Sequence, residues 1–234
     1  MKSSFAYLVG GLIFLMGQET LGQVEAIHKR LEEFKINDHW LAANLKEVDA
    51  IHYYKVKTVT GSNHGNVTSI AEYDPRRKEG KRLQLLSIDG HKASKIQEKK
   101  YYKRIGDQFE SLNGKIDSLS YKVIKDNENW FVVDFRLDKE SLPEHYKFLG
   151  DCTAELHCRK DLMRASYARF QSFQPTKVRM FAADKVDLEV YFKYDEATGS
   201  YIHDEAHYYM EVNMLGIPTE VEMFNYYSDY EVVK

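Results

Sequence analysis

From Ala50 to the C-terminus, apolar and polar residues alternate with a period of two. The clearest case is the stretch 186–195, in which Val, Leu, Val, Phe and Tyr alternate with Asp, Glu, Tyr, Lys and Asp. Successive side chains of a β-strand point to opposite faces, so the alternation predicts strands with one apolar and one polar face. Strands of this kind form antiparallel sheets whose apolar face must be covered.

Turn-forming stretches such as GSNHGN, DPRRKEGK and DNEN separate the alternating segments. We therefore expect roughly eleven strands: Ile51–Val59, Asn66–Tyr73, Arg82–Ile88, Ser118–Lys125, Trp130–Asp138, Phe148–Cys158, Leu162–Phe173, Val178–Ala182, Val186–Asp195, Tyr201–Met214 and Thr219–Val232.

Two segments have helical spacing instead. The first is Val24–Glu47, which Asn37-Asp38 kinks or divides. The second follows Ser94, which forms a capping box with Gln97, and it ends near Gly106. This second helix is polar on most faces, so we expect only Ile96 and one or both of Tyr101 and Tyr102 to reach the sheet.

These elements predict an α+β fold. An open flat sheet would expose its apolar face, so the sheet must close, pack or be covered. With about two helices available, we expect a strongly curved, mostly antiparallel sheet, an incomplete barrel whose concave side the helices cover. Such a fold leaves an apolar cleft between helices and sheet, where small apolar ligands bind.

The first 22 residues have the parts of a cleavable signal peptide. Lys2 precedes the uncharged apolar stretch Phe5–Met16, and Thr20-Leu21-Gly22 places small residues at a cleavage site. The stretch is shorter than the roughly 20 residues that span a bilayer. No cysteine follows it, so this is not a lipoprotein signal. We expect a periplasmic or secreted protein with one domain, residues 23–234.

Charge and cysteines narrow the function further. The net charge of −3 gives no electrostatic reason to expect a nucleic acid partner. Cys152 and Cys158 lie in one alternating stretch, Phe148–Cys158, and six strand residues span about 20 Å. Bridged Cα atoms lie within about 7 Å of each other. We therefore expect two buried, free thiols.

No stretch matches a known catalytic or cofactor motif. The segment His203-Asp204-Glu205-Ala206-His207 differs from the zinc-protease pattern H-E-x-x-H. On a strand the two histidines would share a face about 13 Å apart, too far to ligate one metal. The sequence also lacks a G-x-S-x-G elbow, a P-loop and a G-x-G-x-x-G turn. We expect no enzyme activity, no metal and no cofactor.

One stretch resembles a known family. Ala71-Glu72-Tyr73-Asp74-Pro75 and the following KEGKRLQLLSIDGHKAS resemble bacterial envelope proteins related to the outer-membrane lipoprotein carrier (LolA-like) superfamily. The resemblance implies the curved-sheet fold and non-catalytic binding of acyl chains or lipoproteins. The carriers' proline-glycine segment and arginine-tryptophan strand have no counterpart here, so the resemblance implies a fold and a ligand style and not a particular job. The motif residues Tyr73, Asp74, Pro75, Asp89 and Gly90 also have the composition of turns.

The leading hypothesis is thus an exported envelope protein that binds a lipid, acyl chain or lipoprotein in an apolar cleft, with peripheral contact to a membrane or an envelope protein. The alternatives are a protein-binding or sensory module and, second, a secreted hydrolase. The candidate cleft residues are the inward apolar side chains Tyr54, Leu156, Leu188, Val190 and Phe192, with Trp40 from the covering helix.

Overall fold

The computed structural model describes residues 22–36, 51–62, 65–78, 81–105, 114–178, 181–214 and 216–233. Trp40, the predicted signal peptide up to residue 21 and the second half of the predicted N-terminal helix lie outside these ranges. No helix in the described ranges is both long enough and apolar enough to span a membrane.

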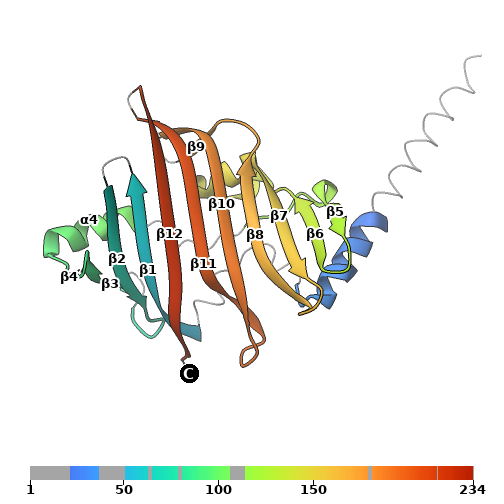
Figure 1. Ribbon diagram of the computed structural model, residues 1–234, viewed down its shortest axis with the longest axis horizontal. Helices are drawn as coiled ribbons and strands as arrows, with labels where there is room; N and C mark the ends of the chain where they lie inside the picture. Colours follow the sequence, from blue (N-terminus) through green and yellow to red (C-terminus); the bar gives the residue numbers. More distant parts are fainter. Residues whose placement is uncertain are drawn as a thin grey trace, which may run out of the picture.

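Within the described ranges, twelve strands form one antiparallel sheet in the order β4-β3-β2-β1-β12-β11-β10-β8-β7-β6-β5, and β9 pairs with β10 (Figure 1). The strands are β1 (His52–Ser62), β2 (Gly65–Tyr73), β3 (Leu83–Ile88), β4 (His91–Lys92), β5 (Lys122–Asp126), β6 (Trp130–Phe135), β7 (Cys152–Arg159), β8 (Arg164–Ser172), β9 (Thr176–Val178), β10 (Phe181–Asp195), β11 (Ser200–Met214) and β12 (Ile217–Val232). The edge strands β4 and β5 do not pair with each other, so the sheet is open. The predicted α+β class with an unclosed antiparallel sheet is confirmed.

Register shows which side chains share a face. One continuous row of paired residues crosses seven strands: Thr58, Asn225, Ala206, Val190, Ala168, Leu156 and Val133. The helices lie on the side to which this row points, which we call the covered face. Figure 1 looks onto the opposite, uncovered face, with the helices behind the strands.

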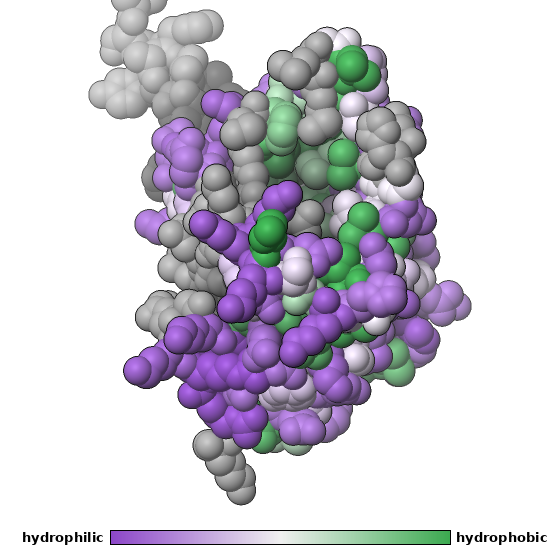
Figure 2. Space-filling model, turned by 90° about the vertical axis from the view of Figure 1, so that its left-hand side faces the viewer, coloured by the Kyte–Doolittle hydropathy of each residue, from purple (hydrophilic) through white to green (hydrophobic). Residues whose placement is uncertain are grey.

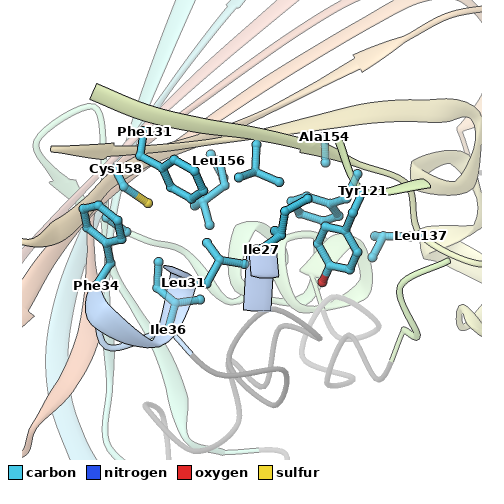
Figure 3. Packing of buried hydrophobic residues seen from close by; sticks show 14 of the residues in the cluster. Ile27, Leu31, Phe34, Ile36, Tyr121, Phe131, Leu137, Ala154, Leu156 and Cys158 are labelled. Atoms are coloured by element: carbon cyan, nitrogen blue, oxygen red, sulfur yellow. The ribbon is translucent and has the colours of Figure 1, made fainter. Parts of the chain in front are cut away.

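The N-terminal helix covers one end of the sheet. It spans residues 22–33 and ends in a Schellman motif, in which the Ile36 N–H donates to the Leu31 carbonyl (3.1 Å) and Lys35 adopts a φ of 60°. Ile27, Leu31 and Phe34 pack beneath β6 and β7 (Figure 3). Of the two alternatives predicted for Val24–Glu47, the structure contradicts a continuous kinked helix, because this motif ends the first helix before Asn37-Asp38; the remainder of the segment lies outside the described residues.

Helix α4 (Lys95–Ile105) covers the opposite end, over β1 to β3. The predicted capping box is present: the Ser94 N–H donates to Gln97 Oε1 (2.9 Å), and the Gln97 N–H donates to Ser94 Oγ (3.3 Å). Tyr101 is buried, and the Tyr102 hydroxyl accepts from the Leu85 N–H (3.0 Å). Ile96, which we expected on the sheet, is 70% exposed.

Three short 3₁₀ helices in the described ranges lie between the strands, and the first and third replace the beginnings of two predicted strands. They are η2 (Ser118–Ser120), η3 (Lys139–Ser141) and η4 (Glu144–Asp151), so the strand expected from Phe148 begins at Cys152. Cys152 and Cys158 are both free and buried, as predicted. Burial raises the pKa of each thiol to about 12.

Candidate functional site

The covered face is buried at both ends and around a third cluster of Ala183, Val186 and Val212, and it is partly exposed in the middle. The cluster under the N-terminal helix holds residues of β6 to β8, and the cluster under α4 holds residues of β1 to β3. Between them lies a band of half-buried, inward-facing residues, which we call the central strip: Thr58, Thr60, Val190, Phe192, His203, Tyr208, Met210, Val221, Met223, Asn225 and Tyr227.

Figure 2 views the molecule from the α4 side, with the uncovered face to the right. Hydrophobic side chains lie inside a hollow in the upper half of this view, where the β1–β2 and β11–β12 hairpins end. Hydrophilic residues dominate the lower half. The hollow therefore opens at the end of the sheet to which the central strip leads.

A polar triad lies within the central strip. Thr58 donates its hydroxyl hydrogen to Asn225 Oδ1 (2.7 Å), and the Asn225 side chain forms a hydrogen bond with the Tyr208 hydroxyl. Burial raises the pKa of Tyr208 to about 12. All three groups are uncharged, so the triad offers neutral hydrogen bonds among apolar side chains.

A belt of aromatic rings crosses the lower part of the covered face. Tyr73 stacks on Tyr54 with ring centroids 5.1 Å apart, and Tyr54 meets Tyr227 at 5.8 Å. His203 then contacts Tyr227 at 5.3 Å and Phe192 at 5.8 Å. Burial lowers the pKa of His203 to about 4, so its imidazole is neutral near pH 7.

The structure separates the predicted cleft residues into two groups. Leu156 and Leu188 are 1% and 8% exposed and belong to the core under the N-terminal helix. Val190 and Phe192 lie at the border of that core, in the central strip, and Tyr54 belongs to the aromatic belt. Trp40 lies outside the described residues.

Tyr73 is the last residue of β2, and the other motif residues form turns at the two opposite ends of β3. Asp74 follows β2, accepts from the Arg76 backbone N–H (3.1 Å) and pairs with the Arg76 guanidinium (2.8 Å), whose hydrogen bonds lower the pKa of Asp74. Pro75 lies in the same turn. Asp89 and Gly90 have φ angles of 49° and 76° and connect β3 to β4. Of the motif residues, Tyr73 is the one whose ring joins the aromatic belt.

A β-bulge separates the two histidines. Tyr191 pairs with Glu205 while its neighbour Phe192 pairs with His203, so Asp204 is the extra residue of the bulge and has no register partner in β10. His203 therefore points to the covered face, and His207 points to the uncovered face beside Phe224. The prediction that both share a face is wrong. Among the described residues, no three His, Cys, Asp or Glu side chains are grouped to hold a metal.

The polar members of the central strip were missed from the sequence. Thr58 and Asn225 are polar residues at inward positions of strands that are otherwise mostly apolar on that face. Once the inward face of a strand is known, the alternation makes such polar exceptions visible. Tyr208 and Tyr227 belong to the doublets Tyr208-Tyr209 and Tyr226-Tyr227. In each doublet one ring points inward and one outward.

The fold was compared with known proteins. No family model and no curated protein matches the sequence. Among solved structures, a LolA superfamily protein from Nitrosomonas europaea has 12% identity and a TM-score of 0.34, with 90% of this chain and 94% of that chain covered. A DUF1329 family protein from Desulfovibrio piger has 8% identity and a TM-score of 0.38, with 89% and 92% covered.

The complex of MucA and MucB from Pseudomonas aeruginosa contains a further similar chain, with 9% identity, a TM-score of 0.19, and 80% and 92% covered. The first of these structures is named for the superfamily that the segment from Ala71 to Ser94 resembles. These similarities concern the course of the chain and not its ligand.

Proposed function

We propose that this chain is a non-catalytic, exported envelope protein that holds an acyl chain of a lipid or lipoprotein on the central strip. The observation that carries the proposal is the partly exposed middle of a sheet face whose two ends are covered by helices. Exposed apolar surface inside a fold is costly, at about 25 cal/mol per Å². A bound acyl chain would remove that cost.

The mixture of side chains fits such a ligand. Val190, Met210, Val221 and Met223 offer flexible or branched apolar surface, and methionine adapts to irregular shapes. The neutral triad around Asn225 can hydrogen-bond an ester or amide where the acyl chain is attached. Both thiols have a pKa of about 12, so neither is a nucleophile near neutral pH.

Binding of a fluorescent fatty acyl probe tests the proposal. Met223→Lys places an ammonium in the strip, and we expect it to weaken probe binding at least about tenfold, since burying an unpaired charge costs several kcal/mol. The control is Tyr226→Lys, on the same strand but on the uncovered face, where Tyr226 is 39% exposed. It should leave probe binding unchanged.

Three results separate this proposal from its alternatives. Equal probe affinity for wild type and Met223→Lys would contradict the acyl-chain site. A wild-type protein that binds no lipid from an envelope extract would favour the protein-binding or sensory module. Turnover of ester or glycoside substrates that survives Met223→Lys would favour the secreted hydrolase. The mass of the exported protein also tests cleavage after Gly22.

A further inference from the structure

The uncovered face carries a continuous ladder of aromatic rings, which we call the outer ladder. It consists of one ring from each of six neighbouring strands: Trp130, His157, Tyr167, Tyr191, His207 and Phe224. Successive centroids are 6.2, 4.1, 5.4, 5.5 and 4.8 Å apart. All six side chains are partly exposed. None of them is needed to bury the core, which lies on the other face.

Carboxylates flank the outer ladder at regular positions. The pattern Glu-x-His or Glu-x-Tyr recurs on β7, β10 and β11, and each carboxylate contacts the ring two residues on. The three contacts are Glu155 with His157 at 2.9 Å, Glu189 with Tyr191 at 2.8 Å and Glu205 with His207 at 3.3 Å. The face therefore combines π surface with carboxylates on three of the six strands.

The β12 end of the ladder is hollowed into a groove of about 390 Å³. The groove is lined by Lys185, Asp187, Glu189, His207, Tyr209, Glu222 and Phe224. Arg169 neutralises Asp187 and Glu189 from β8, with a distance of 2.6 Å to Asp187 Oδ2. No salt bridge within the described ranges engages Glu220 or Glu222, and both are exposed.

The groove is negative, and its rings already accept one cation. The pKa of Tyr209 is raised to about 12. The largest cause is its hydrogen bond to Glu211, followed by burial and by the charges of Glu211, Glu220 and Glu222. The chain's own Lys185 places its ammonium over the Tyr209 ring, 5.0 Å from the centroid. Aromatic rings next to carboxylates favour lysine and arginine side chains.

We propose that the outer ladder and its groove are the docking surface for a basic, extended segment of a protein partner. One lysine or arginine occupies the groove over Phe224, and further cationic side chains lie along the rings toward Trp130. Strands lie about 4.8 Å apart, so the ladder is about 24 Å wide, which matches an extended segment of about seven residues. This surface is on the opposite side of the sheet from the central strip.

The test uses a short fluorescent peptide in which arginine and glycine alternate, titrated into the mature protein by fluorescence anisotropy. We expect saturable binding that weakens as salt is added. A second peptide with glutamate in place of arginine should not bind. Binding that is absent for both peptides would overturn the proposal.

Two pairs of variants locate the site. Phe224→Leu removes a ring without changing charge, and we expect about fivefold weaker peptide binding from the lost cation–π contact. Its control is Phe173→Leu, where a 49% exposed ring already lies under Arg136, off the outer ladder. Glu222→Gln should weaken binding by a similar factor, and Glu25→Gln on the N-terminal helix should not.

Equal effects of a variant and its control would show that the peptide responds only to overall charge, and would overturn the assignment of this face. The acyl probe distinguishes this proposal from the first one. Phe224→Leu should leave acyl binding unchanged, and Met223→Lys should leave peptide binding unchanged, because the two residues point to opposite faces of β12.

Discussion

At the scale of single residues, the direction of a side chain decides what it can do. His203 and His207 are four apart on β11, and regular alternation would place them on one face. The unpaired Asp204 reverses the alternation between them. As a result, His203 is neutral within the aromatic belt, while His207 lies beside Glu205 in the outer ladder.

The lowered pKa of His203 predicts a pH dependence of stability. The folded-state pKa of about 4 lies below the ordinary 6.5, so the unfolded chain takes up the proton first as pH falls. The stability that neutral His203 contributes is present above about pH 6.5 and is lost between there and pH 4. We expect His203→Phe to reduce the fall in the free energy of unfolding over this range by about 2 kcal/mol, a value discounted for partial exposure.

Urea denaturation of wild type and variant at pH 7, 5 and 4 measures the difference. His91→Phe is the matched control, because His91 is exposed on the short edge strand β4. Parallel curves for wild type and His203→Phe would show that His203 titrates normally in the folded protein.

At the scale of elements, one hydroxyl ties the N-terminal helix to the sheet. Tyr201, on β11, is 2% exposed. Its hydroxyl donates to the Phe34 carbonyl (2.6 Å) at the end of the helix and accepts from the Ala165 N–H (2.8 Å) of β8. The Schellman motif leaves this Phe34 carbonyl free to accept, so the way the helix ends determines where it attaches.

Tyr201→Phe should therefore destabilise the protein by about 1–3 kcal/mol, because it leaves a buried donor and a buried acceptor unpaired. The loss should be accompanied by faster amide exchange in residues 22–33 than in α4. The exposed Tyr226→Phe serves as the control and should change stability by less than about 0.5 kcal/mol. An unchanged exchange rate in the helix would mean that the hydroxyl does not hold it.

Elements differ in how well their sequences predict them. Strands β11 and β12 were predicted to within two residues, because long alternation defines both the element and its faces. Strand β10 begins at Phe181, five residues before the predicted Val186, and the separate strand predicted over Val178–Ala182 is instead the last residue of β9 and the first two of β10. Helix α4 was located by its capping box, but its packing was predicted wrongly at Ile96. A helix that is polar on most faces has too weak an apolar side to show which residues reach the sheet.

At the scale of the whole molecule, the last strand holds the sheet together. The C-terminal strand β12 lies in the middle of the sheet, between β1 and β11. It joins the end of the sheet that α4 covers to the end that the N-terminal helix covers. The row of paired residues from Thr58 to Val133 crosses β12 at Asn225. Neither end can complete its sheet without this strand, so we expect one cooperative folding unit over residues 23–234.

Leu156→Ala tests this expectation. The side chain is 1% exposed in the core under the N-terminal helix, so its truncation should cost about 2–5 kcal/mol. In a cooperative domain, the most protected amides of β2 lose the same free energy of exchange as those of β6, although β2 lies at the other end of the sheet. A loss confined to β6 and its neighbours would show two independent units.

The sequence by itself determined the class of the fold. Alternation predicted the strands, capping and turn residues predicted α4 and the β3–β4 turn, and the apolar stripe of β7 predicted two buried free cysteines. These features are local, because propensity, turn geometry and side-chain period act over a few residues.

The tertiary structure alone decided where the two candidate surfaces lie. Leu156 and Val190 are both inward apolar residues, and only the position of the N-terminal helix makes one core and leaves the other half-exposed. The polar triad joins β1, β11 and β12, and the outer ladder joins six strands. Such sites depend on register between residues far apart in the chain, and a single bulge at Asp204 changes which face a side chain reaches.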